Sequence, residues 1–255
     1  MLLAHSTWPE IAHYLESSTG IIIPIGSTEQ HGPTGLMGTD FTIAAAIAEA
    51  AAEHIGCLVA PPITVGMAQH HMAFPGTITV RPSTYISMLV DWIASLSRHG
   101  FRRLYFVNGH GGNIAPAITA FNEFYAQISL QVETGESQTL CKLVNWWLMP
   151  NTDALIKDVF ADADGAHATA SEIAVTQYLH PQSIKAAAPD LEPARSGLPA
   201  LDIHNAYDYR RRFFDGRIGS DVRKANPEHG ELVFRQAVAD VAQDCTEFLA
   251  SLPRD

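Results

Sequence analysis

The feature that most constrains the fold is an alternation of short apolar runs with longer amphipathic ones. Residues 21–25 are four isoleucines and a proline, which is typical of a buried strand. Residues 83–99 carry apolar side chains at three- and four-residue spacing and stop at Gly100, which is typical of a helix. The same signals predict further strands over 57–63, 103–107 and 140–147, and further helices over 40–54, 114–128, 169–179 and 231–252.

Strands that alternate with helices form βαβ units, and such units build a mostly parallel sheet covered on both faces. We therefore predict an α/β fold that forms one domain over residues 1–255. Segment 187–222 is rich in proline, glycine and arginine and has no predicted regular structure. Because it is long for a plain loop, we expect it to serve function or an interface.

Composition excludes several classes of protein. Hydrophobic residues make up 47% of the chain, so intrinsic disorder is not expected. The net charge of −11 argues against a nucleic-acid partner, which needs a basic surface. No run reaches the ~18 apolar residues of a membrane span, and the first residues lack the pattern of a signal peptide. Three widely separated cysteines give no disulfide framework, so we expect a cytoplasmic protein.

Ligands of parallel sheets bind beyond the carboxyl ends of the strands, so polar residues that follow strands are the first candidates for chemistry. Glu29 and His31 follow the first predicted strand, and Asp40 begins the next helix. All three are metal-ligand types. The structural alternative is a loop with two helix caps, because Ser27 and Gln30 match a capping box and Asp40 suits an N-cap.

Two further segments carry similar residues. The sequence Asn-Gly-His-Gly-Gly-Asn at 108–113 follows the third predicted strand, and His110 stands at its apex. The spacing matches neither common phosphate-loop motif, so the alternatives are a metal ligand or a glycine-rich turn. His167 precedes a predicted helix that carries Glu172 in its first turn. Thr169 and Glu172 also match a capping box, which is a structural alternative for Glu172.

The candidate set mixes imidazoles with carboxylates, which suits Zn²⁺, Mn²⁺ or Fe²⁺. Three carboxylates and one hydroxide balance the charge of two divalent ions, and a two-metal hydrolase needs one carboxylate that bridges them. The six candidates are Glu29, His31, Asp40, His110, His167 and Glu172.

These segments, in this order, resemble the creatininase (creatinine amidohydrolase) family. The resemblance covers roughly residues 20–240 and rests on G-S-T-E-Q-H-G-P at 26–33, G-T-D at 38–40, H-x-x-F-P-G-T at 71–77, N-G-H-G-G-N at 108–113, and His167 with Glu172. It implies a three-layer αβα sandwich with a mostly parallel central sheet, a binuclear metal site and hydrolysis of non-peptide C–N bonds. It also implies a homo-oligomer, commonly a hexamer, in which residues 210–212 (Arg-Arg-Arg) could lie at an interface.

The resemblance also implies a role for each candidate. Glu29 and His110 would hold one ion, His31 and Glu172 would hold the other, and Asp40 would bridge them. His167 would donate a proton to the leaving nitrogen, and Glu172 would serve both metal binding and catalysis.

Three positions depart from the family pattern. Members that hydrolyse creatinine carry a carboxylate two residues after the loop histidine, where this chain has Gly112, so Glu172 must take over. Thr169 and Ile173 replace a glycine and a threonine of the family's third segment. These departures weaken the case for creatinine as the substrate, but not the case for a metal site.

Five residues are candidates for contact with a substrate. Trp146 and Trp147 end the fourth predicted strand and would point to opposite faces, so that one joins the core and the other forms a flat pocket wall. His71 is expected in the pocket and His70 at the surface or an interface. Backbone N–H groups near Gly111 and Gly112 could stabilise an oxyanion.

The sequence thus predicts a binuclear-metal amidohydrolase that cleaves an amide, cyclic amide or formamide bond of a small molecule by attack of a metal-bridging hydroxide. Zinc is the expected metal, with manganese or iron as alternatives. The open alternatives are a formamide deformylase of flavin or deazaflavin biosynthesis, a creatininase-like peptidase, and a catalytically idle metal-binding homologue. A serine hydrolase is set aside because the chain has no G-x-S-x-G motif.

Overall fold

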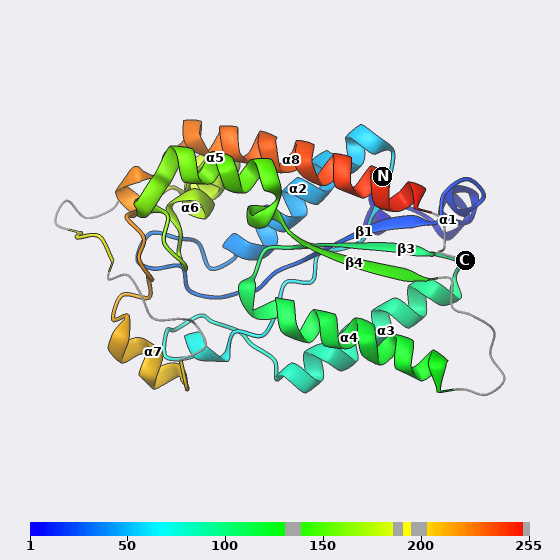
Figure 1. Cartoon of the computed structure of the whole chain (residues 1–255), viewed down its shortest axis with the longest axis horizontal. Helices are drawn as coiled ribbons and strands as arrows, with labels where there is room; N and C mark the ends of the chain where they lie inside the picture. The colour runs from blue at the N-terminus through cyan, green and yellow to red at the C-terminus, as the bar shows by residue number, and fades with distance from the viewer. Residues whose placement is uncertain (131–138, 186–190, 195–202, 252–255) are drawn as a thin grey trace.

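The structure, a computed structural model, describes residues 1–130, 139–185, 191–194 and 203–251. Four parallel strands form a sheet in the order β2-β1-β3-β4 (Figure 1). The strands are β1 (Gly20–Ile25), β2 (Leu58–Val59), β3 (Arg103–Asn108) and β4 (Leu140–Asn145). After β1 the chain adds β2 on one side of it and then returns to add β3 on the other side, so the direction of strand addition reverses between β1 and β3. In such sheets this switch point is the usual place for a ligand.

Helices cover both faces of the sheet (Figure 1). Helices α2, α5, α6 and α8 share one hydrophobic core with one face, and α3 and α4 share a second core with the other. The helices are α1 (Trp8–Leu15), α2 (Thr39–Ile55), α3 (Pro82–Arg98), α4 (Ile114–Ser129), α5 (Pro150–Phe160), α6 (Ala170–Leu179), α7 (Ala206–Arg212) and α8 (Pro227–Ala250). The predicted αβα sandwich is therefore confirmed.

Strand β1 is apolar throughout because both of its faces are buried. Ile22 packs into the core beneath α2 and α8, whereas Ile21 and Ile23 pack into the core above α3 and α4. In the register of the sheet, Ile25 pairs with Asn108, and Asn108 pairs with Asn145. The carboxyl ends of β1, β3 and β4 therefore lie level, and the segments that follow them start side by side.

Two predicted strands are too long. The strand predicted over 57–63 ends at Val59, because Pro61 and Pro62 have no N–H to donate to a ladder. The strand predicted over 140–147 ends at Asn145, and Trp146–Leu148 form a short 3₁₀ helix instead.

Three helices were not predicted: α1, α5 and α7. Helix α5 has 11 residues and begins at a proline, so its periodic signal is short. Helix α7 lies inside segment 187–222, for which no regular structure was predicted. Residues 187–190 and 195–202 of that segment lie outside the described residues, as does the last residue predicted for α8. Of the helices in the described ranges, none is long and apolar enough to cross a membrane.

Candidate metal centre

The loop after β1 carries two candidates, and the helix that follows carries the third. Glu29 and His31 lie between β1 and α2, and Asp40 is the second residue of α2, whose N-cap is Gly38. The prediction that Asp40 caps the helix is therefore wrong. No helix starts directly after Ser27, because the next helix is α2 at Thr39, so Ser27 and Gln30 do not form a capping box. A Cβ at Gly26 would lie 2.4 Å from the backbone nitrogen of Phe41, so this glycine lets the strand end pack against the helix start.

His110 follows β3, and Asn108 fixes its backbone from both sides. The Asn108 side chain accepts a hydrogen bond from the His110 N–H at 3.0 Å and donates one to the His110 carbonyl at 2.7 Å. A Cβ at Gly109 would lie 2.1 Å from the Asp40 carbonyl oxygen. The absence of a side chain at Gly109 therefore allows β3 to end directly against the start of α2, which brings His110 beside Asp40.

In the segment from His167 to Glu172, Glu172 both caps a helix and faces the other candidate ligands. The Thr169 N–H donates to Glu172 Oε1 at 2.8 Å, and the Glu172 N–H donates to Thr169 Oγ1 at 3.2 Å, so the capping box forms at the start of α6. The same Glu172 Oε1 lies 3.5 Å from His31 Nε2. Ala168 adopts a φ of 51°, which turns the chain between His167 and the helix. Capping thus orients the Glu172 carboxylate toward the other candidates.

Two groups of three residues can each hold a metal ion, and they share one member. Within each group the ligand atoms lie within 4.8 Å of one another: Glu29, Asp40 and His110 in the first, His31, Asp40 and Glu172 in the second. Asp40 Oδ1 lies 2.9 Å from His31 Nε2, and its Oδ2 lies 3.2 Å from His110 Nδ1. The two oxygens of Asp40 thus face the two groups separately, as a bridging carboxylate requires.

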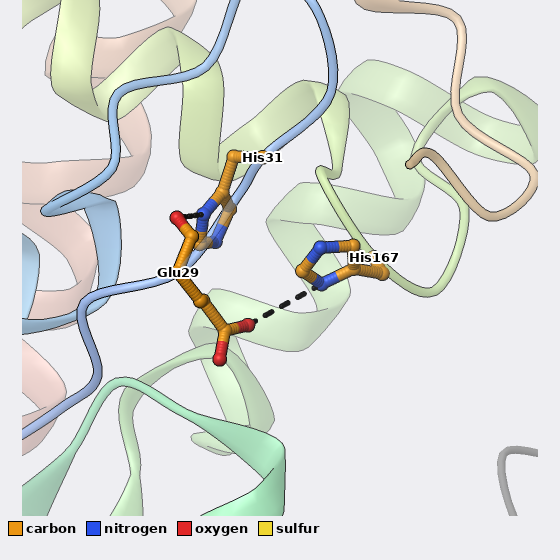
Figure 2. Close-up of side chains that lie close together, drawn as sticks. All are labelled: Glu29, His31 and His167. Carbon is orange, nitrogen blue, oxygen red and sulfur yellow. Dashed lines mark hydrogen bonds and ion pairs between the residues drawn. The ribbon is translucent and has the colours of Figure 1, made fainter. Parts of the chain in front are cut away.

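His167 lies beside the same residues, as Figure 2 shows, and belongs to a third group with Glu29 and His31. Its Nδ1 lies 3.8 Å from Glu29 Oε1. His31 is held by its own loop, because its Nδ1 lies 3.1 Å from the Glu29 carbonyl oxygen. The structure therefore brings all six sequence-predicted candidates into one cluster.

The residue set fits cations, because its buried carboxylates face histidine nitrogens at 3.2–3.3 Å without a well-aligned hydrogen bond. Both Glu29 side-chain oxygens and Asp40 Oδ2 are fully buried without a hydrogen-bond partner. A buried carboxylate without a partner is costly, and a bound cation removes that cost. With neutral histidines, such carboxylates form a typical ligand set for zinc or manganese.

The carboxylates strongly perturb the two histidines that face them. Burial disfavours the charged ring of His31, but the Asp40 and Glu172 carboxylates outweigh burial and raise the His31 pKa to about 10. Burial likewise opposes charge on His110, and Glu29 with Asp40 raises the His110 pKa well above its usual value. Without metal, these two rings are therefore cationic at neutral pH.

Two further groups shift toward their neutral forms. Burial raises the Glu172 pKa to about 7, although the neighbouring His31 opposes the shift. Burial and the charge of His31 lower the His167 pKa to about 3. His167 is therefore a neutral ring at neutral pH in the metal-free protein.

A cavity of about 520 Å³ opens directly onto this cluster. Its walls include Trp146, Trp147 and Gly111 of the predicted substrate contacts. The two tryptophans do not point to opposite faces of a strand, because both lie in the 3₁₀ helix after β4. Their rings meet edge to face with centroids 6.1 Å apart. Trp146 is buried in the core as well, and Trp147 is half-buried.

The other two predicted contacts, His71 and Gly112, are not part of the cavity wall. His71 is buried behind Glu29, with its Nε2 3.3 Å from Glu29 Oε1. A Cβ at Gly112 would lie 2.4 Å from His110 Nε2 and 2.3 Å from the Met67 carbonyl oxygen. Gly112 thus makes room for the His110 ring, and no carboxylate fits at this position without displacing that ring.

Sequence reasoning missed three residues that pack around the cluster. Gln30, expected as part of a helix cap, is buried between His71 and His167. His70, expected at the surface, is half-buried, and its ring is nearly parallel to that of His110 at 6.3 Å. Tyr209 of α7 packs edge-on against His71 with ring centroids 4.6 Å apart. Only Gln30 had a signal in the sequence, because it stands between two candidate ligands.

The chain matches a known protein family over nearly its whole length. The sequence model of the creatininase family, described as creatinine amidohydrolase, matches residues 4–245. Over nearly its whole length the chain is 26% identical to the creatinine amidohydrolase of Pseudomonas putida, with 94% of each protein covered.

Two other relatives match more closely over shorter stretches. The 3-dehydro-scyllo-inosose hydrolase of Thermotoga maritima is 42% identical over 106 residues, which cover 41% of this chain and 34% of the relative. The mycofactocin precursor peptide peptidase of Mycolicibacterium smegmatis is 41% identical over 100 residues, which cover 37% of this chain and 40% of the relative. Each match therefore spans well under two thirds of the relative's length.

Solved structures show the same fold. A crystal structure of creatinine amidohydrolase superposes with a TM-score of 0.87 at 24% sequence identity, over 98% of both chains. Related creatininase structures are described as a manganese form and a Zn–Zn type.

Proposed function

This chain is a hydrolase that belongs to the creatininase family, and from that membership we propose that it is a binuclear-metal amidohydrolase of a small molecule. The observation that carries the proposal is the pair of ligand groups that share Asp40. The proposed reaction is hydrolysis of a C–N bond outside peptides, in an amide, cyclic amide or formamide. Zinc is the proposed metal, and manganese or iron are the alternatives.

In the proposed site, Glu29 and His110 would hold one ion, His31 and Glu172 would hold the other, and Asp40 would be shared between them. Two divalent ions would supply Lewis-acid polarisation of the scissile carbonyl and would lower the pKa of a water molecule. Glu29, His31, Asp40 and His110 are buried, and Glu172 is half-buried and held by its capping box, so little reorganisation is needed during the reaction.

His167 carries the proton in this proposal. Its neutral ring faces Glu29 with Nδ1, at the edge of the cavity. As water attacks the carbonyl carbon, its proton passes to His167 Nδ1. The same proton then passes to the departing nitrogen as the C–N bond breaks, which leaves an acid and an amine. Trp147 and the backbone at Gly111 line the space where the substrate would lie.

A peptidase is the second candidate, because the chain is 41% identical over 100 residues to a mycofactocin precursor peptide peptidase. The chain is equally similar over a short stretch to the inosose hydrolase, so an activity test should include peptides as well as a substrate of that hydrolase.

We also propose that the chain forms a homo-oligomer. Within the chain, Arg210 stacks on Phe74 at 4.3 Å, and Arg211 and Arg212 pair with Asp208.

The test joins metal content to activity. Protein purified in metal-replete medium should hold two divalent ions per chain by elemental analysis. It should hydrolyse one member of a panel of creatinine, a formylaminopyrimidine phosphate, short peptides and 3-dehydro-scyllo-inosose. Chelation should abolish this activity, and zinc or manganese should restore it. Fewer than one ion per chain would indicate a catalytically idle homologue.

A matched pair of histidine variants tests the proton carrier. We expect His167→Ala to lower kcat by about 10²- to 10⁴-fold, the usual contribution of a positioned acid or base. His229→Ala is the control, because His229 is also half-buried and hydrogen-bonded but lies on α8 away from the cavity. Full activity of His167→Ala on the cognate substrate would refute the assignment.

A further inference from the structure

The buried amide of Gln30 touches two histidines that flank the candidate metal centre. Its Nε2 lies 2.9 Å from His71 Nδ1, 2.9 Å from His167 Nε2 and 3.0 Å from the Gly216 carbonyl oxygen. The side chain is 5% exposed, so water does not compete for these contacts. Gln30 itself does not line the cavity that opens onto this centre.

Two contacts fix which end of the amide faces the rings. The Gly32 N–H donates to Gln30 Oε1 at 2.8 Å, and a backbone N–H only donates, so that atom must be the oxygen. The Gly216 carbonyl only accepts, so the atom that faces it must be the nitrogen. Gly216 approaches this closely because it has no Cβ, which would lie 1.9 Å from Gln30 Oε1.

The number of hydrogens available then determines which ring nitrogen is protonated in His167 and in His71. His167 Nε2 lies 2.9 Å from the Gln30 backbone oxygen, which only accepts, so His167 carries its hydrogen on Nε2. The amide nitrogen of Gln30 has two hydrogens, and because His167 Nε2 is itself a donor they go to Gly216 O and His71 Nδ1. The 2.9 Å approach of Gln30 Nε2 to His167 Nε2 is therefore a contact and not a hydrogen bond. His71 therefore accepts at Nδ1 and carries its own hydrogen on Nε2.

We propose that Gln30 is a positioning residue that holds two histidines in their Nε2–H tautomers, each for a different task. Its side-chain amide holds His71, and its backbone carbonyl holds His167. The inference rests on the proposed function, because it explains how the ligand Glu29 and the proton carrier His167 are oriented. Neither task requires Gln30 to touch the substrate.

For His71 the task is to support a metal ligand. With hydrogen on Nε2, the ring faces Glu29 Oε1 at 3.3 Å with a donor instead of a lone pair. The opposite tautomer would set a lone pair against the buried carboxylate. Partners of this kind orient metal ligands, and their loss usually costs about 10- to 100-fold in metal affinity or activity.

For His167 the task is to present an acceptor. With hydrogen on Nε2, the Nδ1 lone pair faces the cluster beside Glu29 Oε1 at 3.8 Å (Figure 2). A proton from water can therefore be received only on the side that faces the reaction. The opposite tautomer would present a hydrogen there and could not take up the proton of the attacking water.

Helix α7 holds this arrangement from behind. The Tyr209 hydroxyl donates to the Gly216 carbonyl at 2.7 Å, so that carbonyl accepts from both Tyr209 and Gln30. The Tyr209 ring closes the far side of His71. The region around α7 and Gly216 thus contributes to the site without lining its cavity.

Neutron diffraction from deuterium-exchanged crystals of the metal-free protein tests the tautomers directly. We expect deuterium on Nε2 and none on Nδ1 in both His71 and His167. In Gln30→Glu, a carboxylate oxygen replaces the donor that faces His71, so His71 should carry deuterium on Nδ1. Deuterium on Nδ1 of His71 in the unaltered protein, or an unchanged His71 in Gln30→Glu, would overturn the proposal.

Kinetics test whether the tautomers matter. Gln30→Met keeps the bulk of the side chain and removes the donor to His71, whereas the backbone carbonyl that holds His167 stays in place. We expect it to lower kcat by about 10- to 100-fold with KM unchanged. Gln236→Met is the control, because the amide of Gln236 also donates a side-chain hydrogen bond, to Asp240 at 2.9 Å, but Gln236 is half-buried and lies on α8. Equal kcat in the two variants would overturn the proposal.

The two proposals fail in different ways. If the unaltered protein hydrolyses nothing in the panel or holds no metal, the proposed function fails, and the diffraction experiment still decides the tautomers. If the protein is an active metalloenzyme but Gln30→Met matches its control, only the role of Gln30 fails.

Discussion

At the scale of single residues, two adjacent glycines have different structural roles. Both were predicted to contact the substrate. Gly111 lines the cavity and has no atom within 4 Å of where its Cβ would lie. Gly112 lies against the His110 ring and the Met67 carbonyl. A carboxylate ligand at position 112 is therefore excluded by packing, and Glu172 joins Asp40 as the second carboxylate beside His31.

We expect Gly112→Ala to destabilise the protein by about 1–3 kcal/mol, because the new methyl group must displace a buried ring or backbone. Metal bound through His110 should be lost with it. Gly111→Ala is the matched control and should change stability by about 0.5 kcal/mol or less. Denaturant unfolding and metal content measure both effects. Equal stability of the two variants would contradict the packing argument.

The sequence predicted which residues cluster at the candidate centre, because few side-chain types bind divalent ions and most of these lie in segments next to strand ends. It did not predict the residues that orient them. Gln30 reaches His71, His167 and Gly216, which lie 41, 137 and 186 positions away in the chain. Such contacts exist only after the chain has folded, and no local pattern in the sequence encodes them.

At the scale of elements, the strands and long helices follow from apolar periodicity, and the errors lie at their ends. Polar residues such as Asn145 end a strand only when the next residues turn, and the two tryptophans after it look equally strand-like. Helix α6 shows the opposite case. Its cap was predicted from Thr169 and Glu172, and that cap also aims the Glu172 carboxylate at His31.

Variants of two similar N-caps can separate the effect of Thr169 on helix stability from its effect on the orientation of Glu172. Thr169→Ala and Asn226→Ala each remove a cap, from α6 and α8 respectively, and each should cost about 1 kcal/mol of stability. Only Thr169→Ala should also weaken binding of the second metal ion, because Glu172 loses its constraint. Thermal unfolding and metal titration of both variants provide the measurement. A similar loss of metal affinity in Asn226→Ala would show that general destabilisation is the cause.

At the scale of the whole molecule, metal binding is coupled to protons. His31, with its pKa raised to about 10, and His110, with a pKa well above its usual value, are protonated at neutral pH without metal. A metal ion binds only the neutral ring, so binding should release protons and apparent affinity should rise between pH 6 and pH 9. Calorimetric titration in buffers of different ionisation enthalpy counts these protons. An affinity independent of pH would contradict the ligand assignment.

The same pKa values predict how stability depends on pH. Because the folded pKa of His31 exceeds its unfolded value of about 6.5, its pairing stabilises the metal-free protein fully below that pH. This contribution is lost as the pH rises toward 10. The melting temperature of the metal-free protein should therefore fall between pH 7 and pH 10, and the metal-loaded protein should not show this fall. If the melting temperatures of the metal-free and metal-loaded protein changed with pH in the same way, the prediction would be refuted.

The shared carboxylate of Asp40 makes the two ion positions unequal in their tolerance of genetic change. A substitution at His110 or Glu172 removes a ligand from one group, whereas a substitution at Asp40 removes one from both. A lineage that abandons catalysis can therefore lose both ions through a single codon. Position 40 is accordingly the most informative position for distinguishing active enzymes from catalytically inactive homologues among related sequences.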